Sequence, residues 1–167
     1  LSPLGWVQWL RPGQSADTLI TRTTGDYPPG EYLCLYQGSG SVRLRNDAME
    51  IQRSPGRILV NVHPSSKGIS LILEKTDDLD PIRNIQLIPQ AMEGSTGPFH
   101  PRFLKNWSPF KVIRFMDWMG TNDSPVKQWS QRTLPTMQTQ GSKSGVALEY
   151  MVALANTLHA DPWFCMP

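Results

Sequence analysis

The chain has 167 residues, a length that suits one ordinary domain or one small domain with part of another. The chain has 16 Lys and Arg and 14 Asp and Glu, so its formal net charge is +2. A net charge this small argues against a charged disordered tail and against a dedicated nucleic-acid-binding protein. No apolar run approaches the roughly 18 residues of a membrane-spanning helix, and two cysteines are too few for a disulfide framework or a cysteine zinc site.

Residues 1–98 are predicted to form β structure. Short segments of alternating or continuous apolar residues follow one another about every 8–12 residues, separated by turns that contain Pro, Gly, Asn or Asp. The expected strands are 31–36, 41–45, 49–53, 57–62, 69–74 and 85–88, with 6–10 and 17–22 as two further candidates. No segment has a convincing helical period. This pattern predicts an antiparallel, jelly-roll-like β-sandwich.

Residues 99–167 have a different pattern, which predicts a second domain or a domain with an insertion. A strand is expected over 111–118 and another over 163–166, with a polar loop and a helix over 146–159 between them. One face of that helix is apolar, through Leu148, Met151, Val152, Ala155 and Leu158. Strand, helix and strand in this order indicate a βαβ unit with parallel strands and a right-handed crossover.

Candidate ligand-binding residues follow from the rule that parallel sheets carry functional side chains at the carboxyl ends of their strands. That rule selects four residues after the first strand, namely Asp117, Trp118, Thr121 and Asn122. Trp163 lies in the second strand. Indole rings stack on the apolar faces of sugars, and carboxylate and amide groups bind hydroxyls. The combination indicates a sugar site.

Structural roles are open for the same residues. A role in its loop, accepting backbone N–H groups, is favoured for Asp117 over catalysis, and Trp118 and Trp163 are suited to core packing as well as to ligand stacking. Arg114 lies inside an apolar strand, where its charge must be paired. Its partner is then either a structural carboxylate or a carboxylate of an active site.

No catalytic residue and no cofactor is predicted. The sequence has no metal-binding, catalytic-triad or nucleotide-binding motif. The carboxylates of the second half do not assemble into a catalytic pair: they are Asp117, Asp123, Glu149 and Asp161. Other aromatic residues are expected mainly in packing roles, namely Trp107 and Trp129 under loops, and Tyr27, Tyr32 and Tyr36 in the sandwich, where a ligand platform is the alternative.

Two stretches carry a resemblance to a known group of proteins. Residues 111–122, KVIRFMDWMGTN, and 145–167, GVALEYMVALANTLHADPWFCMP, resemble uncharacterised bacterial proteins, many from planctomycetes, that are often labelled carbohydrate- or cellulose-binding. They are similar to (β/α)₈ glycoside hydrolases with catalytic glutamates on strands four and seven. The resemblance extends to GEYLCLYQGSGSV and PIRNIQLIP in the β-rich half.

The resemblance implies that this chain is an N-terminal fragment. Residues 1–98 would be a sandwich inserted in a barrel, and residues 99–167 would supply barrel strands two and three, at 111–118 and 163–166. Arg114 then resembles the arginine that supports the nucleophile, while both catalytic glutamates would lie beyond Pro167.

The function implied is that of a polysaccharide-acting, glycoside hydrolase-like protein of secreted or periplasmic location, with no catalytic pair in this chain. Its sugar-subsite residues would be Arg114, Asp117, Trp118, Asn122 and Trp163. The partner expected is a polysaccharide or oligosaccharide, with no nucleic acid and no membrane. The alternatives are a non-catalytic carbohydrate-binding protein and a structural or interaction domain.

Overall fold

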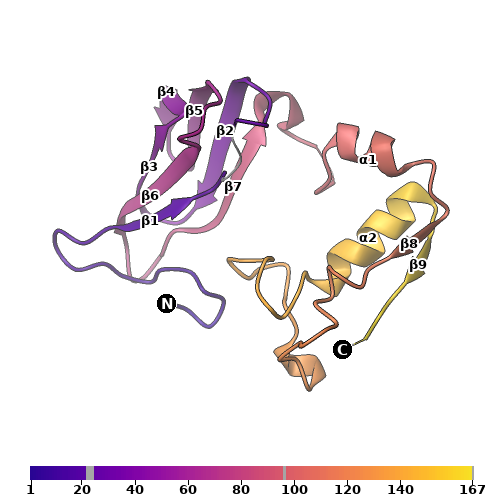
Figure 1. Ribbon diagram of the computed structural model, residues 1–167. Coiled ribbons are helices and arrows are strands. Elements are labelled where there is room, and N and C mark those ends of the chain that lie inside the picture. The colour runs from indigo at the N-terminus through magenta and orange to yellow at the C-terminus, as the bar shows by residue number, and fades with distance from the viewer. Residues whose placement is uncertain (22–24, 96, 167) are drawn as a thin grey trace. The chain divides into compact units, whose positions relative to one another are not determined.

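The computed structural model describes residues 1–21, 25–95 and 97–166 (Figure 1). The chain divides into two compact units, Leu1–Gly94 and Ser95–Pro167. The first unit is built from antiparallel strands, and the second contains two α-helices and two parallel strands. Each unit has a hydrophobic core of its own.

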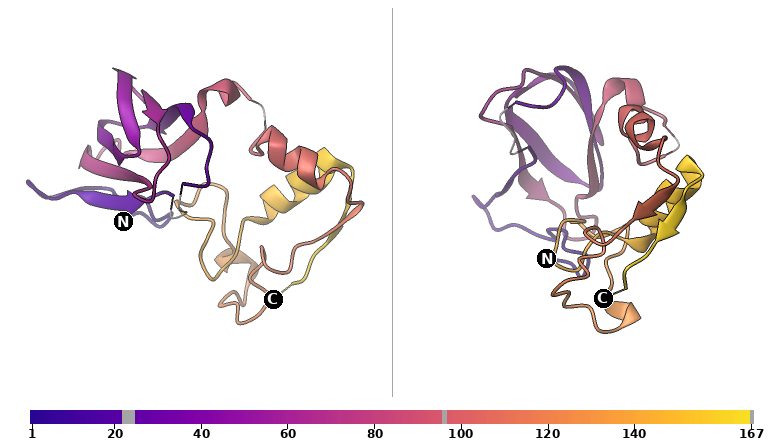
Figure 2. Two further views of the ribbon diagram at one scale, coloured as in Figure 1. Left: turned by 45° about the horizontal axis from the view of Figure 1, so that its top comes forward. Right: turned by 45° about the vertical axis from the view of Figure 1, so that its right-hand side comes forward.

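The first unit consists of two antiparallel sheets (Figures 1 and 2). The strand order is β1-β6-β3 in one sheet and β4-β5-β2-β7 in the other. The strands are β1 (Ala16–Leu19), β2 (Gly30–Gln37), β3 (Gly40–Asn46), β4 (Ala48–Ser54), β5 (Arg57–Val62), β6 (Ile69–Thr76) and β7 (Arg83–Pro89), and the 3₁₀ helix η1 (Gln90–Met92) follows.

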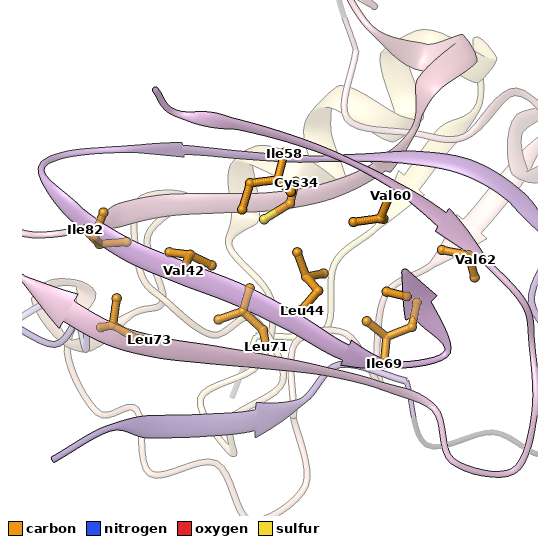
Figure 3. Packing of buried hydrophobic residues seen from close by; sticks show 11 residues of the cluster. Cys34, Val42, Leu44, Ile58, Val60, Val62, Ile69, Leu71, Leu73 and Ile82 are labelled. Atoms are coloured by element: carbon orange, nitrogen blue, oxygen red, sulfur yellow. The ribbon is translucent and has the colours of Figure 1, made fainter. Parts of the chain in front are cut away.

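Apolar side chains from both sheets meet in one core. Period-two alternation points every second residue of a strand inward. The inward residues here come from β2, β3, β5 and β6, and Ile82 from the segment before β7 joins them. Figure 3 shows them facing one another: Cys34, Val42, Leu44, Ile58, Val60, Val62, Ile69, Leu71, Leu73 and Ile82. Two sheets that share one apolar interior form a β-sandwich, so the predicted antiparallel sandwich is confirmed.

The strand positions agree closely with those expected from the sequence. All six principal strands are present. β1 overlaps the candidate stretch 17–22 but starts one residue earlier and ends at Leu19. Arg22 itself lies outside the described residues. The candidate strand at 6–10 is wrong, because these residues have no regular structure. A turn precedes them, in which the Ser2 N–H donates to the Trp6 carbonyl (2.7 Å) and the Trp6 N–H to Ser2 Oγ (3.0 Å).

A buried carboxylate fixes the corner where the chain passes from β3 in one sheet to β4 in the other. Asp47 is 5 % exposed. Its Oδ2 accepts from Tyr27 Oη and from the Ser65 N–H, and its Oδ1 accepts from Ser65 Oγ, each at 2.5 Å. The Asp47 N–H donates to the Gly68 carbonyl (3.1 Å). One side chain thus joins the segment before β2, the corner and the β5–β6 connection.

These hydrogen bonds determine the charge of Asp47. Burial by itself raises the pKa of a carboxyl, but the hydrogen bonds from Ser65 and Tyr27 together outweigh burial, and the pKa of Asp47 is lowered below its ordinary value of 3.8. The charge, in turn, acts on its partner: burial and the hydrogen bond to Asp47 raise the pKa of the Tyr27 hydroxyl.

We predict that Asp47→Asn destabilises the sandwich, because an amide cannot accept all three hydrogen bonds. A pKa lowered by folding contributes stability above the unfolded pKa, and that contribution is lost as pH falls through the folded value. Wild-type stability should therefore drop below about pH 4 more steeply than that of the variant. Thermal melts followed by circular dichroism from pH 7 to pH 2 measure both effects, with a loss of at least about 4 °C expected at pH 7.

Asp78→Asn is the matched control for that experiment. Asp78 is exposed in the same unit, and its substitution removes the same charge. Equal melting temperatures for the two variants at pH 7 would contradict the role assigned to Asp47.

The two cysteines are both free, and they differ in exposure. Cys34 is fully buried in the sandwich core, where burial raises its pKa to about 12. Cys165 is partly exposed and follows β9 (Asp161–Trp163), so its predicted position inside a strand is wrong.

We predict selective alkylation of the two thiols, because the thiolate is the reactive form. Iodoacetamide at pH 8 should modify Cys165 in the native protein and reach Cys34 only after denaturation. Peptide mass spectrometry measures the two rates. Similar labelling of both thiols in the native state would show that the core is open to the reagent.

The second unit contains a βαβ arrangement. Its elements are α1 (Pro101–Trp107), β8 (Val112–Arg114), η2 (Trp129–Gln131), α2 (Leu148–Leu158) and β9. β8 and β9 pair in parallel, with Ile113 opposite Pro162 and Arg114 opposite Trp163. The core between α2 and the strands includes Ile113, Phe115, Met151 and Leu154. The predicted parallel strands joined through a helix are therefore confirmed.

The element boundaries differ from the predictions. The strand expected over 111–118 ends at Arg114, because a turn begins at Phe115, where the Met119 N–H donates to the Phe115 carbonyl (2.9 Å). The strand expected over 163–166 spans 161–163 instead. In α2, Leu154 is buried and Val152 is 41 % exposed, so the predicted apolar face was slightly rotated.

Helix α1 and the extent of the parallel sheet also differ from the predictions. Helix α1 was missed, although Pro101 occupies its first turn and the His100 side chain caps it by accepting from the Arg102 N–H (3.1 Å). The parallel sheet within the described residues has two strands, β8 and β9, and these residues form no barrel.

Candidate functional site

The carboxyl ends of β8 and β9 lie at one edge because the strands are parallel. The segments that follow the strands are joined there. Thr121 Oγ1 donates to the Cys165 carbonyl (2.5 Å), and the Cys165 N–H donates to Met119 Sδ (3.2 Å). This is the edge at which sequence reasoning placed the ligand-binding residues.

Arg114 and Trp163, both predicted site residues, come together on the face of the sheet that α2 does not cover. Their backbones are paired, and the Arg114 guanidinium lies 5.1 Å from the centroid of the Trp163 ring. Trp163 is 56 % exposed, whereas Ile113 points the other way into the core. Trp163 is therefore available for stacking, and the alternative of core packing is wrong.

The structural ion pair considered for Arg114 is absent. Within residues 1–21, 25–95 and 97–166 no carboxylate oxygen lies within 4.0 Å of its guanidinium. The charge is exposed on the sheet surface, and the polar contact of the group is Nη2 with Met116 Sδ (3.1 Å). Arg114 thus keeps most of its donors free for a ligand.

The other predicted site residues lie in the turn and segment after β8. Asp117 and Asn122 both have exposed side chains. Trp118 is partly buried, packs against the core and lies 5.7 Å from the Phe115 ring, so it serves mainly as a packing residue. The structure therefore unites Arg114 with Trp163 and places Asp117 and Asn122 on the exposed surface of the connected segment.

A pocket of about 400 Å³ opens beside the start of α2. Most of its wall is apolar, and its polar members include two cations and no acidic side chain. The lining residues are Met119, Val126, Lys127, Gln128, Trp129, Arg132, Thr133, Ser144, Val146, Leu148, Met151 and Met166. Its volume falls within the range of small-molecule sites, about 300–1,000 Å³.

Sequence reasoning missed this pocket. Trp129 was expected to pack beneath a loop, but it is 60 % exposed on the pocket wall. The Arg132 guanidinium stacks 4.1 Å from the centroid of its ring, and Arg132 Nη2 pairs with Glu149 Oε1 at 3.1 Å. The three-residue spacing of Trp129 and Arg132 was the available signal, and the short helix η2 brings the two side chains together.

Polar side chains hold the irregular wall of the pocket. Gln131 Oε1 accepts from the backbone N–H groups of Lys127 (2.8 Å) and Gln128 (3.0 Å). The buried Thr133 hydroxyl donates to the Gly145 carbonyl at 2.8 Å, and Gln140 Oε1 accepts from the Ala147 N–H at 2.8 Å. A loop without regular structure is thereby held in one shape.

Gly145 is required by a close backbone contact at the pocket. Its φ is +77°, and a Cβ there would lie 2.5 Å from the Trp118 carbonyl oxygen. The next residue, Val146, donates its N–H to the same carbonyl at 2.6 Å. The loop before α2 is therefore held directly on the turn after β8, and no side chain fits between them.

We predict that Gly145→Ala destabilises the second unit by at least about 2 kcal/mol, from the left-handed backbone and the clash together. Gly141→Ala, in the same loop, is the control, since the nearest atom to its Cβ would be Thr139 Oγ1 at 3.9 Å. Urea unfolding followed by tryptophan fluorescence measures both variants. The assignment fails if both variants unfold at the same urea concentration.

The tyrosines of the sandwich do not form a ligand platform. Tyr27, Tyr32 and Tyr36 are partly buried and pack against the core of the first unit. The Tyr32 hydroxyl donates to the Pro28 carbonyl at 2.9 Å, and that of Tyr27 to Asp47. The sequence analysis favoured a packing role for these tyrosines, and that prediction is confirmed.

Comparison with known proteins gives no relative: no family model, no curated protein and no solved structure matches this chain. Among the residues that the structure describes, no helix is long and apolar enough to cross a membrane. The same residues contain no cluster of three or more His, Cys, Asp or Glu side chains that could hold a metal ion.

Proposed function

We propose that this chain binds carbohydrate on the exposed face of the β8–β9 sheet. The observation that carries the proposal is the Arg114–Trp163 pair, in which a half-exposed indole lies beside a guanidinium that has no carboxylate partner among the described residues. An indole offers a flat apolar surface to the C–H groups of a sugar ring, and the guanidinium offers hydrogen-bond donors to its hydroxyls.

Preorganisation supports the proposal. The stacked guanidinium restricts the rotamers of both side chains before a ligand arrives, which lowers the entropic cost of binding. Asp117 and Asn122, exposed on the segment after β8, would add acceptors and donors for further hydroxyls. An open face of this kind suits an extended polysaccharide better than a single small molecule.

The resemblance to (β/α)₈ glycoside hydrolases forms the finer part of the proposal. A strand, a helix and a parallel strand make up the repeating unit of such a barrel. In that setting the face with Arg114 and Trp163 would be directed to the barrel interior, and the catalytic glutamates would belong to strands other than β8 and β9. Residues 1–167 would then contribute sugar contacts rather than catalytic carboxylates.

Binding to a panel of plant and algal polysaccharides tests the proposal. We expect the wild-type chain to be retarded by at least one polysaccharide in affinity electrophoresis. Trp163→Ala should weaken that binding about tenfold, because it removes the apolar contact between the indole and one sugar ring. Trp107→Ala is the control, since Trp107 is an exposed tryptophan on α1, 39 % accessible.

Arg114→Gln provides a second variant that retains the indole. It should weaken binding without changing the melting temperature, since Arg114 is exposed. Absence of retardation by every polysaccharide, or equal losses in Trp163→Ala and Trp107→Ala, would refute the proposal.

A further inference from the structure

We infer that the pocket beside α2 binds a small organic anion with an apolar body, that is, an aromatic or alkyl carboxylate. The pocket uses none of the residues assigned to carbohydrate, so the inference is independent of the proposed function. It follows from three features of the pocket: its apolar floor, its charge and its exposed indole.

The floor of the pocket is apolar. Met119 and Met151 belong to the core beneath it, and Val146, Leu148 and Met166 add further apolar surface. Burying the apolar part of a ligand on this surface is favourable by about 25 cal/mol per Å². A neutral sugar would leave many of its hydroxyls there without partners, at a cost for each one, so this pocket and the sheet face select different ligands.

The charge of the pocket is positive. Lys127 and Arg132 line it; Glu149, which is not part of the lining, pairs with Arg132, so Lys127 supplies the unpaired positive charge. Within the described parts of the chain, no carboxylate oxygen lies within 4.0 Å of the Lys127 ammonium. A ligand carboxylate would therefore meet an uncompensated cation at the mouth of an apolar cavity, where the lowered dielectric strengthens their attraction.

Arg132 has donor capacity that the protein does not use. Its Nη2 binds Glu149, but its Nε–H is buried and has no hydrogen-bond partner among the described residues. Nε itself is closed off by its neighbours, but 26 % of the Arg132 side chain is exposed. A ligand carboxylate would meet that exposed part, while the apolar body of the ligand packs against Trp129, which is 60 % exposed and lines the pocket.

Calorimetric titration of the full chain with two matched pairs of probes tests the inference. The aromatic pair is 1-naphthoate and 1-naphthylmethanol, and the alkyl pair is octanoate and 1-octanol. In each pair the bodies are alike and only the acid is charged. We expect at least one acid to bind about fivefold or more tightly than its alcohol, the gain from a charge-assisted hydrogen bond. The acid that binds more tightly shows whether the pocket prefers an aromatic ring or an alkyl chain.

Lys127→Met separates the charge from the cavity, since it keeps an apolar stem of similar length. It should weaken binding of the acid about fivefold and leave binding of the alcohol unchanged. Lys105→Met, which removes an exposed charge on α1, is the matched control and should bind like the wild type.

The inference is overturned if neither acid binds at about 1 mM, if each alcohol binds as tightly as its acid, or if Lys127→Met and Lys105→Met behave alike. A chain that binds these acids but no polysaccharide would support the inference and refute the proposed carbohydrate function. A chain that binds a polysaccharide but neither acid would support the carbohydrate function and refute the inference. The failure of one is therefore distinguishable from the failure of the other.

Discussion

The parallel pairing of β8 with β9 is the constraint on which both candidate sites depend. Two parallel strands cannot be joined by a tight turn, so the chain must cross over, and here it does so through a long loop and α2. The helix buries one face of the small sheet and leaves the other face open. The open face carries Arg114 and Trp163, and the crossover loop builds the pocket at the start of α2.

The crossover loop has little regular structure, and backbone contacts compensate for that. Val146 and Gly145 lie against the turn after β8, and the buried Thr133 hydroxyl satisfies the Gly145 carbonyl. A side chain at position 145 would separate the loop from the turn and change the shape of the pocket. The glycine therefore serves the site although it contacts no ligand itself.

In the sandwich, a buried charge holds the connections between strands in place. Asp47 lies at the corner between sheets, where a buried carboxylate is tolerated only if its oxygens are satisfied. Ser65 and Tyr27 supply the donors, and they come from connections distant in the sequence. The connections of the first unit therefore depend on the hydrogen bonds of one buried carboxylate beside an apolar core. Those of the second unit depend on close backbone packing between loops.

Tryptophan–arginine pairs occur at both candidate sites, but their surroundings give them different chemistry. Trp163 and Arg114 lie on an open sheet face, where exposed polar side chains follow in the sequence. Trp129 and Arg132 line a cavity with an apolar floor and a second cation, Lys127. A stacked guanidinium holds its indole in place in both cases, and the neighbouring side chains decide which ligand each pair suits.

The sequence alone determined the strands of the sandwich, because period-two alternation and turn residues are local signals that burial on one face imposes. It also determined the βαβ order, and it named Arg114 and Trp163 among the expected sugar-subsite residues, although it did not predict that the two would pair. It did not determine the length of β8, since the turn at Phe115 depends on contacts with the later segment around Cys165. Nor could it find the pocket. The walls of the pocket and the partners of Asp47 come from residues far apart in the chain, and only the tertiary structure brings those residues together.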